Sequence, residues 1–137
     1  MTFTDAGPLI AIIDADEPDH EACLEVLDRV SLPLVTTWPA LTEAMDLLGR
    51  AGGIAAQRAL WRLVLTRRLV IGELSGRALE RSARLMDLYA DRPMDLADAT
   101  LVAYAEEHGR RTIFTLDAGF EVYRLRGRAR FELLPAR

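Results

Sequence analysis

Residues 94–105 form an almost wholly apolar stretch whose interior contains an acid, Asp98. At about 100° per residue, Asp98 shares a helical face with Leu101, Val102 and Ala105. A helix that is apolar in nearly every direction has to be covered on all sides, so this stretch predicts a buried helix. An ionised carboxylate in such a helix costs several kcal/mol unless a cation or strong hydrogen bonds meet it.

Two interpretations of this buried acid are open at the level of local sequence. In the first, Asp95 is the N-cap of the helix and Asp98, at the third helical position, supports the free N–H groups of the first turn. In the second, Asp98 binds a metal ion together with carboxylates from elsewhere in the chain. Asp95 is then either the cap or an additional ligand.

The composition is that of one globular domain, which we expect to span residues 1–137, with 50% hydrophobic and 28% charged residues. The longest apolar run, residues 8–13, is too short to span a membrane, and the sequence predicts a cytoplasmic protein. A single cysteine, Cys23, allows no internal disulfide, and the isolated histidines, His20 and His108, do not suggest zinc.

Charge is unevenly distributed along the chain. Residues 1–30 carry eight acids and one arginine, whereas residues 109–137 carry seven arginines and three acids, so a net charge of −4 does not exclude a nucleic-acid partner. All 17 basic residues are arginines. The absence of lysine excludes Walker-A nucleotide hydrolases and Schiff-base enzymes.

Short β-prone segments alternate with helical patterns along the chain. We expect strands at residues 2–5, 33–36, 68–72 and 112–115, and an edge strand at 130–134. We expect helices at residues 9–13, 19–30, 38–48, 54–66, 76–90 and 95–108, and a helical turn at 120–124. This alternation predicts an α/β fold, with a central parallel sheet of four to five short strands flanked by helices in a three-layer, Rossmann-like arrangement.

Four carboxylates are expected to converge at the carboxyl edge of this sheet. Asp5 and Asp117 follow the first and fourth strands, Glu43 lies in the helix after the second, and Asp98 begins the helix that leads to the fourth. Without compensation these groups would repel one another. A divalent cation, Mg²⁺ or Mn²⁺, would resolve the repulsion, and the usual work of such a site is phosphodiester chemistry.

Each of these acids also has a simpler explanation when taken alone. Asp5 could initiate the Gly7-Pro8 turn, Asp117 could cap a short helix, and Glu43 could be a solvated surface residue. Asp46, about one turn after Glu43, competes with it as a ligand. The order and spacing of the four acids favour the metal site over four independent coincidences.

Four segments together resemble the PIN-domain ribonucleases, and most of all the VapC-type toxins of toxin–antitoxin pairs. They are Thr4-Asp5-Ala6-Gly7-Pro8-Leu9-Ile10, Glu43, Leu96-Ala97-Asp98-Ala99 and Thr115-Leu116-Asp117. The resemblance implies that Asp5, Glu43, Asp98 and Asp117 bind Mg²⁺, for which Mn²⁺ can substitute, with Thr115 near the site. It also implies RNA cleavage, a homodimer, and inhibition by a cognate antitoxin. Many relatives have Ser or Thr where this chain has Ala6.

A cluster of arginines near the C-terminus alternates in sequence: Arg124, Arg126, Arg128 and Arg130. In one extended strand all four would point the same way. Contact with RNA phosphates and a solvated surface are both open for these residues.

Two other functions compete with a nuclease. One is a catalytically idle binding module whose acidic edge receives an arginine-rich segment of a partner. The other is a phosphatase built on Asp14 and Asp16, which is disfavoured because no strand precedes the pair at the right place and the chain has no lysine.

Overall fold

A five-stranded parallel sheet forms the centre of the computed structural model, which describes residues 1–136. Across the sheet the strands are ordered β3 (Leu69–Gly72), β2 (Leu34–Thr37), β1 (Thr2–Thr4), β4 (Thr112–Phe114) and β7 (Glu132–Leu134). Every neighbouring pair is parallel, with Phe3 opposite both Val35 and Ile113. The α/β fold predicted from the sequence is therefore confirmed.

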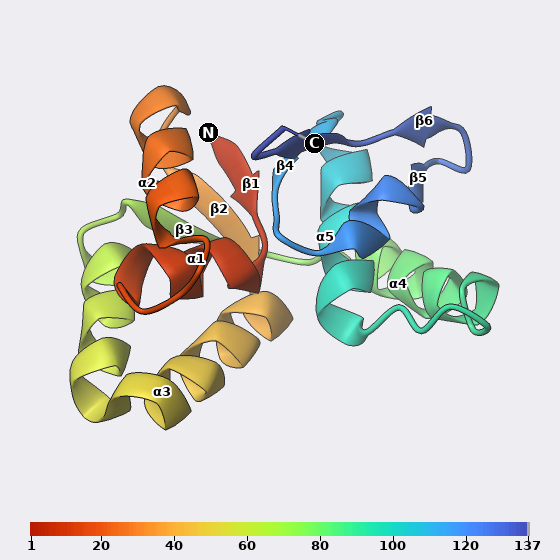
Figure 1. The fold of residues 1–137 in the computed structure, drawn as a ribbon. Coiled ribbons are helices and arrows are strands. Elements are labelled where there is room, and N and C mark those ends of the chain that lie inside the picture. Colours follow the sequence, from red (N-terminus) through yellow and green to blue (C-terminus); the bar gives the residue numbers. More distant parts are fainter. Residues whose placement is uncertain (137) are drawn as a thin grey trace.

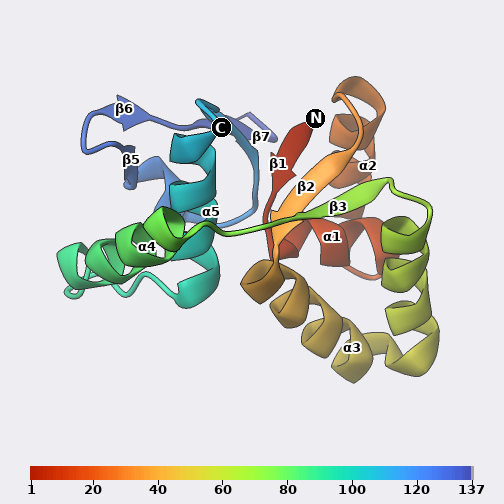
Figure 2. The ribbon, with the colours of Figure 1, turned by 180° about the vertical axis from the view of Figure 1, so that it is seen from behind.

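Helices cover both faces of this sheet (Figures 1 and 2). One side carries α1 (Ala6–Ile13), α2 (His20–Arg29) and α3 (Trp38–Leu65), and the other carries α4 (Gly76–Leu88) and α5 (Leu96–Glu107). Each side has its own apolar core, and Phe3 and Phe114 project from the sheet into opposite cores. Within residues 1–136, no helix is both long enough and apolar enough to cross the lipid bilayer.

The helix α5 is enclosed as its composition predicts. All ten residues from Ala97 to Glu106 are buried, Asp98 among them. The helix lies between the sheet and α4, and Tyr104 packs on Phe3 of β1 with ring centroids 5.1 Å apart. This burial on every side removes Asp98 from bulk solvent.

The element α3 consists of two helical arms, as the sequence predicts. They meet at Gly53, whose φ of 64° and ψ of −157° are not helical, so the second arm begins at Ile54. The first arm runs a few residues beyond the expected end near Gly49. A positive φ is readily adopted by glycine, so Gly53 permits the sharp change of direction between the arms.

The arginine cluster does not form one extended strand. Arg124 begins β5 (Arg124–Leu125), the chain reverses at Arg126 and Gly127, and Arg130 ends β6 (Ala129–Arg130), which pairs antiparallel with β5. The condition under which all four arginines would point the same way is therefore not met, because positive φ at Arg126 and Gly127 turns the chain back. The edge strand is also shorter than expected.

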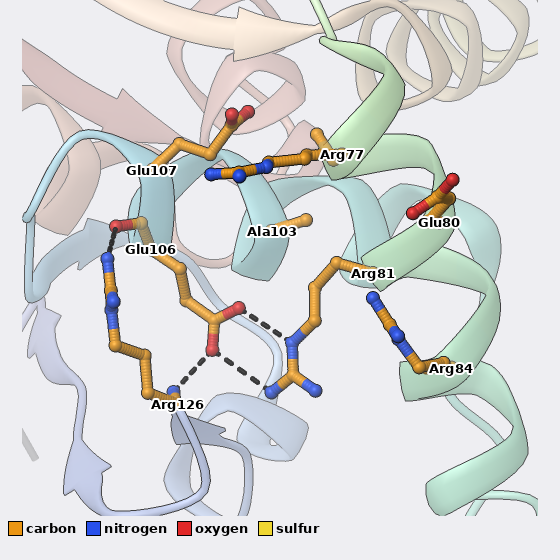
Figure 3. Close-up of a pocket in the computed structure, with 9 residues that line it drawn as sticks. Arg77, Glu80, Arg81, Arg84, Ala103, Glu106, Glu107 and Arg126 are labelled. Carbon is orange, nitrogen blue, oxygen red and sulfur yellow. Dashed lines mark hydrogen bonds and ion pairs between the residues drawn. The ribbon is translucent and has the colours of Figure 1, made fainter.

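The hairpin is attached to α5 by a buried acid (Figure 3). Glu106 accepts hydrogen bonds from Arg81 Nε at 2.8 Å and Nη2 at 3.1 Å, and one of its carboxylate oxygens also accepts the backbone N–H of Arg126. The Arg126 guanidinium donates to the main-chain oxygen of Glu106 at 3.1 Å. A bidentate partner and an added N–H compensate the desolvation of this carboxylate. Through these hydrogen bonds, Glu106 of α5 links α4 to the hairpin.

The packing of α5 on the sheet can be tested at Gly72, the last residue of β3, which lies against the ring of Tyr104. A Cβ at Gly72 would lie 2.3 Å from Cζ of Tyr104, whereas a Cβ at Gly76 would meet nothing within 4 Å. We expect Gly72→Ala to lower the free energy of unfolding by about 1–3 kcal/mol through overpacking. Gly76→Ala should leave it unchanged or raise it by up to about 1 kcal/mol. Urea denaturation followed by circular dichroism measures both, and equal stability of the two variants would contradict this account.

Candidate metal centre

Three carboxylates meet at the carboxyl edge of the sheet. One oxygen from each of Asp5, Asp98 and Asp117 lies within 4.8 Å of the others. Asp5 directly follows β1, Asp117 lies just beyond β4, and these strands are parallel neighbours, so their carboxyl ends adjoin. Asp98 arrives from the first turn of α5. Asp5 is thereby brought together with two acids that follow it by more than 90 positions in sequence.

Asp5 is buried and held at both of its oxygens. Its Oδ1 accepts the N–H of Ala6 at 2.7 Å, and its Oδ2 accepts the hydroxyl of Thr115 at 2.9 Å. Burial raises the pKa of Asp5 to about 6, and the charges of Asp117 and Asp95 add to the rise, against the opposing effect of the two hydrogen bonds. The Thr115 hydroxyl also accepts the N–H of Asp117 at 3.0 Å. Thr115 therefore connects two members of the cluster.

Asp98 is the most perturbed acid of the three. Its side chain is buried, and Oδ2 accepts a hydrogen bond from the hydroxyl of Tyr123 at 2.9 Å. Burial raises the pKa of Asp98 to about 8, and the nearby charges of Asp5 and Asp95 contribute, while the Tyr123 hydrogen bond lowers it. In the protein alone, Asp98 consequently holds a proton at neutral pH. A bound cation would favour the ionised form.

The capping interpretation applies to Asp95 and not to Asp98. Asp95 is the N-cap of α5, as predicted, and its Oδ1 accepts the N–H of Asp98 at 2.8 Å. Within residues 1–136, the carboxylate of Asp98 accepts a hydrogen bond from Tyr123 and none from the N–H groups of the first turn. Capping of α5 therefore explains the position of Asp95 but does not explain the buried carboxylate of Asp98.

Glu43 lies outside the group of three, on the exposed surface of α3. Partial burial raises its pKa, with further contributions from the charges of Asp95, Asp5 and Asp117. Glu43, Asp46 and Asp95 line the same open cavity of about 680 Å³, beside Trp38. Asp46, the competing candidate, forms an ion pair with Arg50 at 3.1 Å. Glu43 therefore stands at the rim of the acidic cluster.

Tyr123, whose hydroxyl contacts Asp98, was not among the candidate residues identified from the sequence. Residues 120–124 were expected to form a helical turn, whereas η1 spans Ala118–Glu121 and Tyr123 follows it as a buried aromatic residue. An aromatic residue at such a position is usually a core residue, so no local pattern identified its contact with Asp98.

The hydroxyl of Thr37, the residue at the N-cap position of α3, makes no capping hydrogen bond to that helix. It pairs instead with the hydroxyl of Thr100 at 2.8 Å, inside the protein.

The chemistry of the donor set suits a hard divalent cation. Carboxylate oxygens are the ligands that Mg²⁺ and Mn²⁺ prefer. Two of the three acids, Asp5 and Asp98, are buried, and desolvation raises the pKa of both. Repulsion adds to the rise, from Asp117 at Asp5 and from Asp5 at Asp98. A cation placed among them would remove that repulsion. The residues present therefore fit a metal centre.

The raised pKa values predict how the stability of the metal-free protein varies with pH. In the pH range from about 4 to about 8 the folded state holds protons on Asp98 and Asp5 that the unfolded state has released, so stability falls as pH rises. We expect Asp98→Asn to flatten this dependence and to stabilise the metal-free protein at pH 8 by about 2–4 kcal/mol.

Urea denaturation at several pH values, in the presence of a chelator, measures this effect. Asp46→Asn, at an exposed acid outside the group of three, is the control and should keep the wild-type dependence. Marked destabilisation by Asp98→Asn at pH 8 would instead assign Asp98 a structural role.

Comparison with known proteins agrees with this fold. Residues 2–125 match the PIN domain family. Ribonuclease VapC26 of Mycobacterium tuberculosis is 32% identical over 132 residues, which cover 96% of this chain and 98% of that protein. The crystal structure of VapC20 from Mycobacterium tuberculosis, described as a Sarcin-Ricin loop cleaving toxin, has a TM-score of 0.82 at 19% identity and covers 89% of this chain and 94% of its own. A chain of a toxin–antitoxin complex from Klebsiella pneumoniae has a TM-score of 0.64 at 20% identity, with 85% and 87% covered. The chain belongs to the PIN-domain family and is of the VapC type.

Proposed function

We propose that this protein is a Mg²⁺-dependent endoribonuclease toxin that cleaves phosphodiester bonds in RNA. The observation that carries the proposal is the meeting of Asp5, Asp98 and Asp117 within 4.8 Å, with two of these acids buried. The 32% identical relative, which matches over nearly its full length, is named as a ribonuclease. The catalytic unit in this proposal is a single PIN domain of residues 1–137.

The residues of the chain have distinct roles in this proposal. Asp5, Asp98 and Asp117 would hold the cation, with Mn²⁺ able to replace Mg²⁺. When bound, the cation supplies neutralisation of phosphate charge and a more acidic water. Thr115, through its hydrogen bonds to Asp5 and to the N–H of Asp117, orients two of the acids. Asp95 secures the first turn of α5 and so the position of Asp98.

Glu43 is proposed as the fourth acid of the site. The charges of Asp95, Asp5 and Asp117 contribute to the raised pKa of Glu43. Glu43 is therefore close enough to the acidic cluster to interact with it electrostatically. Mg²⁺ keeps several waters in protein sites, so an exposed carboxylate can complete the ligand set through a water. The Arg50 partner of Asp46 argues against Asp46 in this role.

We also propose a cognate antitoxin as partner, a homodimer as the assembly, and a cytoplasmic location. Support for the antitoxin comes from the likeness to a chain of a toxin–antitoxin complex. The acidic edge would accept an arginine-rich segment of that partner. The alternative function, a binding module without catalysis, uses the same edge and differs only in the absence of cleavage.

Two of the clustered arginines are the better candidates for RNA contact. Arg128 and Arg130 are exposed on the hairpin. Arg124 instead donates to the carbonyl oxygens of residues 121–123, and Arg126 donates to that of Glu106. Phosphate contact is thus proposed chiefly for Arg128 and Arg130.

The nuclease proposal is tested at Asp98. Asp98→Asn should lower metal-dependent RNA cleavage by at least about 100-fold, because the site loses a charged ligand. Mn²⁺ should raise the thermal midpoint of the wild type at pH 8 and raise that of the variant much less. Cleavage is measured on total RNA with and without a chelator. A wild type that cuts no RNA at saturating Mn²⁺ would favour the binding module.

Glu43 and Asp46 can be separated by a matched pair of substitutions on α3. Glu43→Gln should reduce cleavage by about 10-fold or more, whereas Asp46→Asn should keep activity within about 2-fold of the wild type. Initial rates at saturating Mg²⁺ measure both. The reverse ranking would transfer the fourth position to Asp46.

A further inference from the structure

We propose that Tyr123 is a positioning residue of the carboxylate centre. Its hydroxyl fixes the orientation of Asp98, engaging Oδ2 and leaving Oδ1 free for a divalent cation. This inference rests on the proposed function, since it takes the acidic cluster to be the site of cation binding. It concerns a residue outside the four acids, and its test uses a binding measurement as well as activity.

The contact between Tyr123 and Asp98 is direct and shielded from solvent. Tyr123 is 4% exposed and Asp98 is 5% exposed, and the hydroxyl donates to Oδ2 at 2.9 Å. Within residues 1–136, Oδ1 of Asp98 accepts no hydrogen bond. A carboxylate held at one oxygen presents the other in a defined direction.

The ring of Tyr123 is itself held by aromatic neighbours. It packs edge-to-face against Tyr89 and Phe120, with ring centroids 5.1 Å apart in both pairs and interplanar angles of 66° and 78°. Phe120 in turn packs against Phe131 at 5.4 Å. Such packing restricts the side-chain torsions that would swing the hydroxyl away from Asp98.

The main chain after Tyr123 is anchored to Tyr89, the C-cap of α4, and to Glu106 of α5. The N–H of Arg124 donates to the hydroxyl of Tyr89 at 3.2 Å, and Arg126 is bound to Glu106 through both its N–H and its guanidinium (Figure 3). Asp98 and Glu106 lie eight residues apart on the helix, which corresponds to about 12 Å. Residues 123–126 therefore contact α5 at two separated points. This double attachment fixes the segment that carries the Tyr123 ring.

Gly119 provides the space that the hydroxyl requires. A Cβ at this position would lie 2.8 Å from the Tyr123 hydroxyl oxygen and 3.1 Å from Oδ1 of Asp117. Only a residue without a side chain allows both groups to remain where they are. Gly119 therefore has two roles: its N–H donates to Asp117 at the start of η1, and its lack of a side chain leaves space for the Tyr123 hydroxyl.

The experiment is Tyr123→Phe, which removes the hydroxyl and keeps the ring. Loss of a hydrogen bond to a metal-ligating carboxylate typically lowers metal affinity 10- to 100-fold. We expect the Mn²⁺ dissociation constant at pH 8, from isothermal titration calorimetry without RNA, to rise at least about 10-fold. Metal-dependent cleavage at subsaturating Mn²⁺ should fall in parallel and recover at high Mn²⁺.

Tyr104→Phe is the matched control, because Tyr104 is a buried tyrosine of α5 that packs on Phe3 of β1 and lies beside Gly72 of β3. It should bind Mn²⁺ as the wild type does. Tyr89→Phe removes the hydroxyl that holds Arg124 and leaves the Asp98 contact in place. If Tyr89→Phe weakens Mn²⁺ binding as much as Tyr123→Phe does, the loss of affinity results from a less rigid 123–126 segment and not from the hydrogen bond to Asp98. That outcome would overturn the proposal.

Asp98→Asn, measured in parallel, separates this inference from the proposed function. If Asp98→Asn loses Mn²⁺ affinity and Tyr123→Phe keeps it, the role of Tyr123 is overturned and the nuclease proposal stands. If Asp98→Asn binds Mn²⁺ as the wild type does, the metal centre itself fails and the inference fails with it. Urea denaturation of each variant verifies that the protein titrated is folded.

Discussion

The buried carboxylate of Asp98 is the constraint on which the rest of this structure depends. It lies within a run of ten consecutive buried residues of α5, Ala97 to Glu106, and burial together with the charges of Asp5 and Asp95 raises its pKa to about 8. A fold gains no stability from such a group unless something compensates its ionised form. The Tyr123 hydroxyl donates one hydrogen bond to it, and the cation proposed for this site would supply the remaining compensation.

The parallel sheet explains how such a site can be assembled at all. The carboxyl ends of β1 and β4 adjoin, so Asp5 and Asp117, which follow these strands, lie close together. The first turn of α5 adds Asp98 to them. Hydrogen bonds from Thr115, from the N–H groups of Ala6 and Gly119, and from Tyr123 then fix three carboxylates that would otherwise repel. Rigid acids aimed at one point are what cation binding requires, because a pre-arranged site pays little to order its ligands.

The C-terminal segment contributes more to the site than its sequence suggests. It provides Asp117 beyond β4, then Gly119 and Tyr123 around η1, and then a hairpin that is tied to the far end of α5 by Glu106. The alternating arginines of residues 124–130 have different surroundings in this hairpin. Arg124 and Arg126 donate to main-chain carbonyl oxygens, whereas Arg128 and Arg130 are exposed. The same region thus braces α5 at both ends and carries one of the acids.

The sequence by itself determined the fold class, the burial of α5 and the candidate acids, because hydrophobic periodicity and the alternation of strands with helices along the chain are local properties. It also placed the break in α3 among Gly49, Gly52 and Gly53, but not at which of these glycines the first arm ends, since the three look alike in sequence. It also could not show that Tyr123 meets Asp98 or that Glu43 stands at the rim, apart from the other three acids. Those facts depend on where elements distant in the chain are packed, and only the tertiary structure decides the position of one side chain relative to another.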